Sequence, residues 1–273
     1  MPENAGAYNG KDDALARHRL QEGVIYLDSN DAPAYSNKGN ELNSLKRPEE
    51  ALKAYEEAIR LDPGYASAYS GKGWALNELG RYAEGFRACE EAISLDPSNA
   101  WAYNNKGNAL IGLKRPEEAL EAYEEAIRLD PGNATMHSNK GYVLNELERY
   151  EETVRACEEA IRWDPDDASA YRNKGFALSE LERYEEALRA YEEAIRLEPG
   201  DAIAYNNRGT ALDGLERYEE SVQAYDEAIR LDPGFALAYY NKAAALRRLG
   251  REAEARQAYD TARQLQAHAR RPH

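Results

Sequence analysis

The chain has 273 residues, of which 42% are hydrophobic and 31% charged, and its net charge is −15. This negative charge repels nucleic-acid phosphates and anionic lipid, so we expect neither nucleic acid nor a membrane as a partner. The sequence contains no run of the ~18 apolar residues that a membrane span needs, and residues 1–13 lack the apolar core of a signal peptide. A cytoplasmic protein is therefore predicted.

The N-terminal region falls into two parts. Residues 1–11 include several Gly and Asn residues and predict an irregular or disordered segment. Residues 12–31 match the second half of the later repeats, because the stretch 27–30 (Leu-Asp-Ser-Asn) stands where 61–64 (Leu-Asp-Pro-Gly) stands later. We expect an N-terminal capping helix at 12–31, a partial repeat without a first helix of its own.

From Ala32 onward the sequence repeats every 34 residues. An Asn-Lys-Gly motif marks the period, and a period of this length indicates stacked two-helix repeats, with a first helix A and a second helix B. The seven predicted repeats are 32–65, 66–99, 100–133, 134–167, 168–201, 202–235 and 236–269, followed by a tail at 270–273.

Apolar residues recur at helical spacing within each repeat. In the first repeat, Tyr35, Gly39, Leu42 and Leu45 share one face of helix A, where the glycine leaves room for a neighbouring helix. Helix B carries a second apolar stripe and stops at an Asp-Pro-Gly turn, because proline cannot continue a helix. That stripe consists of Ala51, Leu52, Tyr55, Ala58 and Ile59.

Cys89 and Cys157 interrupt this pattern. They take the helix B position that Tyr55 holds in the first repeat, and they lie 68 residues, or two repeats, apart. Helices stack about 8–10 Å apart, so a disulfide between these cysteines is out of reach. We expect buried, reduced thiols.

Charged residues also follow the period. Arg47 and its counterparts stand in the turn between helices A and B, which suggests a structural contact in each turn. On helix B, Glu and Arg four residues apart predict intrahelical ion pairs that keep the outer face soluble. These pairs are Glu56–Arg60, Glu124–Arg128, Glu158–Arg162 and Glu192–Arg196.

The residue types and their spacing within each repeat resemble the pattern of the tetratricopeptide repeat family over residues 32–269. The positions that carry the resemblance in the first repeat are Tyr35, Gly39, Ala51, Tyr55, Ala58 and Pro63. The chain departs from the family pattern in having Tyr (once His137) for Trp and Lys or Arg for the first Leu. The resemblance implies an all-α fold, a right-handed superhelical α-solenoid of helix-turn-helix repeats whose A helices line a concave surface.

Helical geometry then places the second, fifth, sixth, ninth, twelfth and thirteenth residues of each repeat on that concave surface. The sixth position is almost always Asn, whose amide both donates and accepts hydrogen bonds and can pair with an extended peptide backbone. The row is similar to the asparagine ladders of O-linked N-acetylglucosamine transferases; alternatively, each amide bonds to the neighbouring repeat. Its members are Asn37, Asn105, Asn139, Asn173, Asn207 and Asn241.

Large aromatic residues occupy further concave positions and are candidates for selecting peptide side chains. Alternatively, these rings pack between adjacent A helices. The candidates are Trp74, Trp101, Tyr142, Phe176 and Tyr240, with Ile111 and Ile203 as further apolar anchors and Arg172 at a fifth position. Because Arg172 is the one basic residue at the second, fifth and sixth positions, a chaperone-tail clamp is disfavoured.

The sequence shows no catalytic constellation. Its four histidines (His18, His137, His268 and His273) are scattered without metal-ligand spacing, and no phosphate-binding loop is present. We therefore expect no catalytic residue, metal or cofactor, and predict a non-enzymatic scaffold that binds an extended peptide or protein segment in the concave groove. The alternative is a structural scaffold that self-assembles into homo-oligomers without a peptide ligand.

Overall fold

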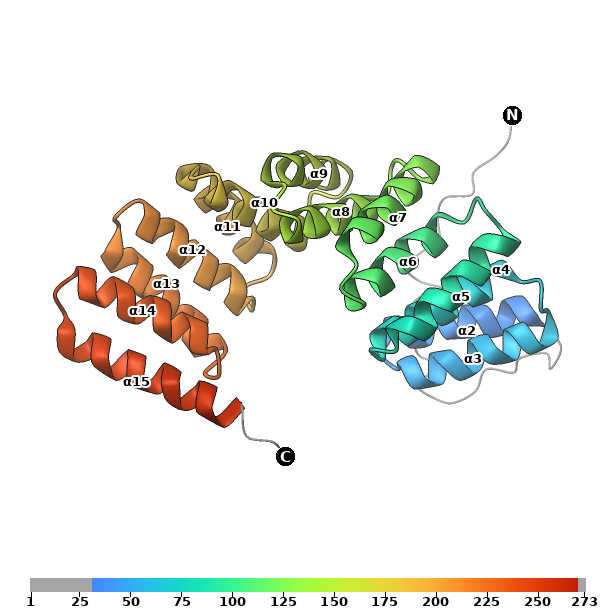
Figure 1. Cartoon of the computed structure of the whole chain (residues 1–273), viewed down its shortest axis with the longest axis horizontal. Helices are drawn as coiled ribbons and strands as arrows, with labels where there is room; N and C mark the ends of the chain where they lie inside the picture. Colours follow the sequence, from blue (N-terminus) through green and yellow to red (C-terminus); the bar gives the residue numbers. More distant parts are fainter. Residues whose placement is uncertain (1–30, 270–273) are drawn as a thin grey trace. The chain divides into compact units, whose positions relative to one another are not determined.

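The computed structural model describes residues 31–269, so the segments predicted at 1–11, 12–31 and 270–273 lie outside the described residues apart from Asp31. Within this range all regular secondary structure is helical, in alternating A and B helices (Figure 1). The A helices are α2 (Ala32–Ser44), α4 (Ala66–Glu78), α6 (Ala100–Gly112), α8 (Ala134–Glu146), α10 (Ala168–Glu180), α12 (Ala202–Gly214) and α14 (Ala236–Arg248). The B helices are α3 (Pro48–Leu61), α5 (Tyr82–Leu95), α7 (Pro116–Leu129), α9 (Tyr150–Trp163), α11 (Tyr184–Leu197), α13 (Tyr218–Leu231) and α15 (Glu252–Ala269).

The chain forms two compact units, residues 1–129 and 130–273, whose described helices are α2–α7 and α8–α15. Inside each unit every A helix packs on its own B helix, and every B helix packs on the next A helix. Successive A helices also contact one another, α2–α4–α6 in the first unit and α8–α10–α12–α14 in the second. The all-α fold of repeated helix pairs is confirmed.

The turns between helices A and B share one geometry. The Lys46 N–H donates to the Asn43 carbonyl and the Arg47 N–H to the Leu42 carbonyl, both at 2.9 Å, which closes helix α2. This motif needs a left-handed residue: Gly80 and Gly250 fill that position in two turns, and Lys or Glu fills it at positive φ in five others. Those five residues are Lys46, Lys114, Glu148, Glu182 and Glu216.

The turn arginine makes the structural contact that was predicted. Arg47 donates from Nε and Nη2 to the two carboxylate oxygens of Glu50, at 2.6 and 2.7 Å. Its counterparts repeat this bidentate pair, so each arginine fixes the start of its helix B. The repeated pairs are Arg81–Glu84, Arg115–Glu118, Arg149–Glu152, Arg183–Glu186, Arg217–Glu220 and Arg251–Glu254.

The helix B tyrosines form the centre of the packing. Tyr55 has 0% exposure, and Gly39 and Gly71 of two successive A helices lie against its ring. A Cβ at Gly39 or Gly71 would stand 2.5 or 2.3 Å from Tyr55 Cε1, so both positions require glycine. Leu45, predicted on the same apolar face, is 38% exposed, because no described repeat precedes it to cover its side.

The predicted intrahelical pairs four residues apart are wrong for the helix B arginines. Arg60 bonds Glu57, three residues away, while Glu56 lies 3.2 Å from Lys72 in the next A helix. The acidic residue at the repeat boundary therefore has a competing partner that the helix alone does not reveal. The same three-residue pairs occur at Arg128–Glu125, Arg162–Glu159 and Arg196–Glu193.

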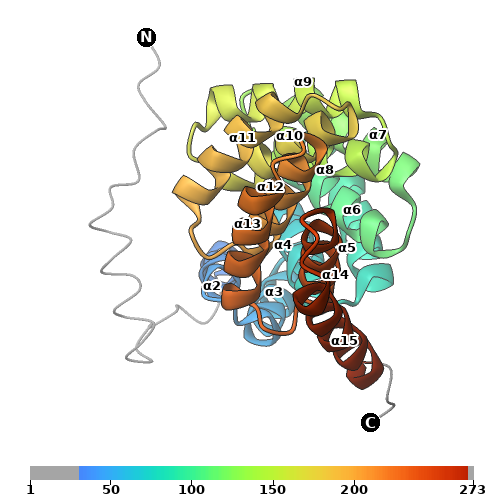
Figure 2. The ribbon, with the colours of Figure 1, turned by 90° about the vertical axis from the view of Figure 1, so that its left-hand side faces the viewer.

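The last helix is longer than the other B helices. Ala267 stands where earlier repeats have proline, and α15 continues to Ala269 beside α14 (Figure 2). Its exposed face carries mainly polar residues, among them Arg256, Gln257 and Asp260. A polar outer face is what the end of a stacked array requires.

Candidate protein-binding surface

Four large apolar side chains stand exposed at the helix A positions that the sequence assigns to the concave surface. Trp101 is 48% and Tyr142 44% exposed, and Ile203 and Leu237 are 51% and 52% exposed. Leu237 is absent from the candidates that sequence reasoning singled out, although its place at the second position of its repeat, as for Trp101, is a usable signal. Exposed rings and aliphatic chains of this size are common at recognition sites.

The sixth-position asparagines divide into two groups. Asn105 is buried, and its Nδ2 donates to the Ser70 carbonyl at 3.2 Å in the preceding repeat. Asn241 likewise donates to Asn206 Oδ1 at 3.0 Å. These two amides hold adjacent A helices together, which is the alternative role considered above.

The remaining asparagines are more open. Asn37 is exposed, while Asn139 and Asn173 are half-buried. The Asn207 Oδ1 accepts from Asn206 at 3.2 Å, whereas the Asn173 side chain makes no hydrogen bond to a described residue. Asn37 and Asn173 therefore have no side-chain bond to a described residue, whereas the other four members already interact within the fold. Those four are Asn105, Asn139, Asn207 and Asn241.

Two of the predicted aromatic residues contact neighbouring helices. Phe176 meets Tyr150 edge to face, with ring centroids 6.3 Å apart. Tyr240 meets Tyr259 in the same way at 5.4 Å, and its hydroxyl donates to Gln266 Oε1. These rings pack between helices, as the alternative reading of the aromatics holds.

Arg172 is engaged as well. Its guanidinium lies 2.5 Å from the Asp201 carboxylate, which also accepts from two backbone N–H groups at the start of α12. The single basic residue among the candidates is therefore already neutralised inside the second unit.

Position nine depends on the helix B residue that faces it. The buried hydroxyls of Tyr55 and Tyr123 donate to Asn40 and Asn108 at 2.7 Å. The two cysteine repeats have no hydroxyl to satisfy there, and position nine carries the rings of Trp74 and Tyr142.

The cysteine repeats use a different polar contact. Asn77 Nδ2 donates to the Asn105 carbonyl at 2.8 Å, and Asn145 donates to the Asn173 carbonyl at 3.1 Å. Cys89 and Cys157 are buried free thiols, and burial raises the pKa of each to about 12. The predicted burial of both cysteines is confirmed, and the raised pKa makes them poor nucleophiles.

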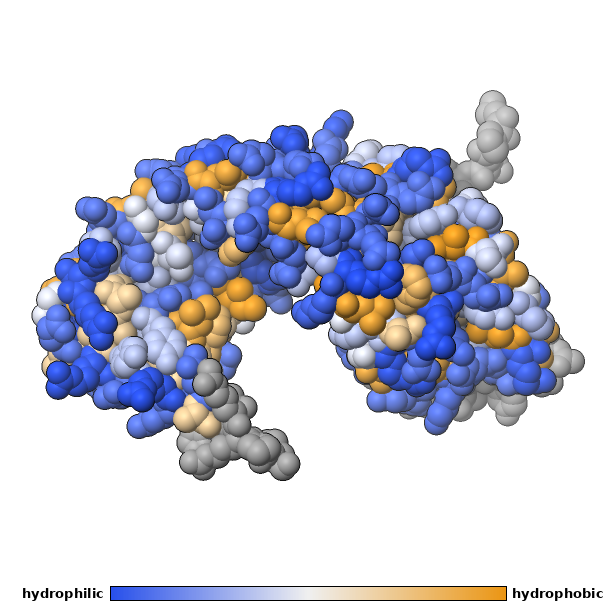
Figure 3. Space-filling view, viewed as in Figure 1, coloured by the Kyte–Doolittle hydropathy of each residue, from blue (hydrophilic) through white to orange (hydrophobic). Residues whose placement is uncertain are grey.

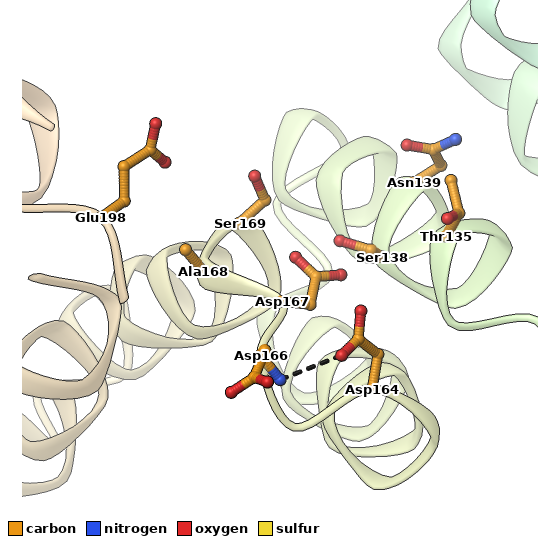
Figure 4. Close-up of a pocket in the computed structure, with 9 residues that line it drawn as sticks. All are labelled: Thr135, Ser138, Asn139, Asp164, Asp166, Asp167, Ala168, Ser169 and Glu198. Atoms are coloured by element: carbon orange, nitrogen blue, oxygen red, sulfur yellow. Dashed lines mark hydrogen bonds between the residues drawn. The ribbon is translucent and has the colours of Figure 1, made fainter. Parts of the chain in front are cut away.

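A pocket of about 440 Å³ opens between α8 and α10 in the second unit (Figure 4). Thr135, Ser138 and Asn139, the second, fifth and sixth residues of their repeat, line one side. The opposite side is acidic. It consists of Asp164, Asp166, Asp167, Ala168, Ser169 and Glu198.

The surface elsewhere is mainly hydrophilic, with separate apolar patches over both units (Figure 3). No helix in the described part of the chain is long and apolar enough to cross a membrane. Among residues 31–269, no group of three or more His, Cys, Asp or Glu side chains is placed to hold a metal ion.

Models of the tetratricopeptide repeat match nearly all of the repeat region. The matched residues are 32–65, 66–99, 100–133, 133–198, 172–234 and 207–270. No curated protein sequence matches the chain.

Several solved structures have the same fold. The crystal structure of YrrB, a TPR protein with an unusual peptide-binding site, is 26% identical with a TM-score of 0.57, covering 70% of this chain and 98% of YrrB. Residues 41-end of MamA from Desulfovibrio magneticus RS-1 are 25% identical with a TM-score of 0.57, covering 63% and 97% of the two chains. PilF of Pseudomonas aeruginosa is 20% identical with a TM-score of 0.66, covering 76% and 94%, and this likeness shows the fold alone.

Proposed function

Because the chain belongs to the tetratricopeptide repeat family of protein-interaction scaffolds, we propose that it is a non-enzymatic scaffold that binds an extended segment of a partner protein. The segment lies along the A helices of a unit. Exposed rings accept its apolar side chains, and the open asparagine amides pair with its backbone.

One observation carries this proposal: large apolar side chains stand exposed at helix A positions in both units. Trp101 and Tyr142 each remain more than 40% exposed although the fold offers buried aromatic positions nearby. Large rings with this much surface in water favour a surface that a partner covers. The similarity to YrrB, a TPR protein with a peptide-binding site, supports the same role.

The test is a peptide selection followed by affinity measurement. Peptides selected from a random 12-residue library against the full chain are labelled with fluorescein, and their affinity is measured by anisotropy. We expect Trp101→Ala or Tyr142→Ala to weaken binding of selected peptides about tenfold or more, as truncated aromatic anchors do. Helical content, followed by circular dichroism, should not change.

Trp163→Ala is the matched control, because Trp163 is 52% exposed but ends helix B in α9. Equal losses from Trp163→Ala and Trp101→Ala would contradict a helix A binding surface, as would a library that yields no binder. A mass that rises with protein concentration in light scattering, without any peptide binding, would favour self-assembly instead.

A further inference from the structure

The loop 164–167 differs from the other loops that join consecutive repeats. It reads Asp-Pro-Asp-Asp, whereas the corresponding loops read Asp-Pro-Gly-Tyr, Asp-Pro-Ser-Asn, Asp-Pro-Gly-Asn, Glu-Pro-Gly-Asp and Asp-Pro-Gly-Phe. The loop therefore places three carboxylates on one side of the pocket, and Glu198 adds a fourth. No lysine or arginine lines this pocket.

The fold uses only part of this acidic group. Asp164 accepts from the Asp166 N–H at 3.0 Å, and Asp167 accepts from the Ala170 N–H at 2.9 Å, each through Oδ1. Their Oδ2 atoms make no hydrogen bond or ion pair with a described residue. Arg196, whose guanidinium interacts electrostatically with Asp166, forms its ion pair with Glu193 instead, at 2.8 Å.

Ser138 is the second indication of a ligand. Its side chain is only 7% exposed, yet its hydroxyl makes no hydrogen bond with any described residue. In Figure 4 this hydroxyl points into the pocket, as do the carboxylates of Asp164 and Asp167. Because this hydroxyl faces the space of the pocket and has no partner among the described residues, an occupant can accept or donate a hydrogen bond there in place of water.

The equivalent serine of the first unit, Ser70, has a hydrogen-bond partner that Ser138 lacks. Ser70 is engaged by the Asn105 amide of the next repeat, at 3.2 Å to its carbonyl and 3.5 Å to its hydroxyl. Asn173 stands in the place of Asn105 but makes no such bond to Ser138. The Ser138 hydroxyl and the Asn173 amide are thus left without a hydrogen bond to a described residue.

The occupant is an organic cation. Within residues 31–269 the acidic side chains are not gathered closely enough to ligate a metal ion, so the carboxylates surround a space instead of a point. Guanidinium and ammonium groups carry several N–H donors that can reach the two carboxylates and the Ser138 oxygen together. The volume of the pocket is in the range of about 300–1,000 Å³ found for small-ligand sites.

We propose that this pocket binds an arginine or lysine side chain of the partner segment, an inference that rests on the proposed function for its biological setting. Because Thr135, Ser138 and Asn139 belong to helix A positions two, five and six, the pocket lies on the surface to which the peptide is assigned. The pocket therefore selects a basic residue, whereas Tyr142 of the same unit selects an apolar one.

The experiment separates this pocket from peptide binding as a whole. Amide NMR shifts of the full chain are followed during titration with N-acetyl-arginine amide and, separately, with its uncharged isostere N-acetyl-citrulline amide. We expect saturable shifts centred on Ser138, Asp167 and Ala170 with the arginine compound, and affinity for the citrulline compound at least fivefold weaker. The shifts should weaken as salt is raised, because the attraction is electrostatic.

The variant Asp166→Gly with Asp167→Asn gives the loop Asp-Pro-Gly-Asn, which this chain already has at 130–133 before α8. It should abolish the shifts. Asp232→Asn removes one charge from another loop and should leave them unchanged. Equal binding of the arginine and citrulline compounds, or shifts spread over the acidic surface, would overturn the pocket while leaving the peptide proposal intact. If the arginine compound binds at the pocket but the chain captures no library peptide, the peptide proposal is overturned and the pocket is kept.

Discussion

Repeats 32–65 and 66–99 have the same length and helix bounds but different interiors. In the first, the Tyr55 ring fills the space between Gly39 and Gly71, and its hydroxyl donates a hydrogen bond to Asn40 Oδ1. In the second, Cys89 replaces the tyrosine, so no ring occupies the corresponding space. Asn77 instead donates a hydrogen bond to the Asn105 carbonyl of the next repeat. Position nine then carries Trp74 instead of an amide.

The comparison indicates that the interior residue constrains the surface positions beside it. It does not decide position nine alone, since Phe176 stands there in the repeat of Tyr191. A tyrosine needs a polar partner, which constrains position nine or twelve, as Ser179 and Asp213 illustrate beside Tyr191 and Tyr225. A cysteine needs none, so its repeat can present an aromatic ring outward. Replacing the interior residues and their polar partners should therefore change the stability of the fold, and the following predictions test this.

Tyr123→Cys should have the largest effect. It removes a ring that is 1% exposed and leaves both a cavity and an unpaired Asn108, which should cost about 3–4 kcal/mol of unfolding free energy. Urea unfolding followed by circular dichroism measures this loss. Tyr259→Cys, at the 38% exposed counterpart in α15, should cost under about 1 kcal/mol; equal losses would contradict the interior role of the tyrosine.

Gly107→Ala should destabilise less. The new Cβ would stand 2.5 Å from Tyr123 Cε1, and overpacking of about 1–3 kcal/mol outweighs the gain in helix propensity of about 1 kcal/mol. The last repeat already has Ala243 at this position, opposite the more exposed Tyr259. If thermal unfolding finds Gly107→Ala as stable as the parent chain, the tyrosine is not held in place as described.

Asn77→Ala tests the contact particular to the cysteine repeats. Losing the bond to the Asn105 carbonyl should cost about 1 kcal/mol, partly offset because the buried Asn77 Oδ1 has no partner of its own. Hydrogen exchange should detect faster opening of α6, which receives this bond, than of α2. Unchanged exchange in α6 would show that the amide does not couple the two repeats.

Asp213→Asn should produce the smallest change, and a stabilising one near neutral pH. Burial raises the pKa of the Asp213 carboxyl, which accepts from the Tyr225 hydroxyl at 2.8 Å, so its protonated form is favoured in the folded chain. The stability given by that form is complete below the unfolded pKa and is lost as pH rises through the folded pKa. The variant should thus gain about 0.5 kcal/mol at pH 7, a modest figure because the side chain is partly solvated.

This gain should shrink as the pH is lowered through the titration of Asp213, where the parent carboxyl becomes neutral too. Melting temperatures of the parent and the variant between pH 3 and 7 measure the difference. A gap that stays constant over this range would exclude titration of Asp213 as its cause.

The repeat period, the helix pairs and the turn arginines could be predicted from sequence, because each depends on residues within one repeat. The roles of the asparagines could not, since Asn105 and Asn173 share a position and differ only in their contacts with the preceding repeat. Ion pairs failed for the same reason: Lys72 of the next helix competes for Glu56. The acidic pocket combines loop 164–167 with α8, although three aspartates in one loop were a visible signal.

The turns that hold Lys46, Lys114, Glu148, Glu182 and Glu216 at φ near 60° offer a route to thermostabilisation. A side chain in left-handed backbone costs about 1 kcal/mol, which glycine avoids, although glycine gives back part of this through its freedom in the unfolded chain. Gly80 and Gly250 already adopt this geometry. Glycine at the other five turns would make a heat-resistant scaffold for engineering new specificities, because these turns lie apart from every residue assigned to ligand recognition.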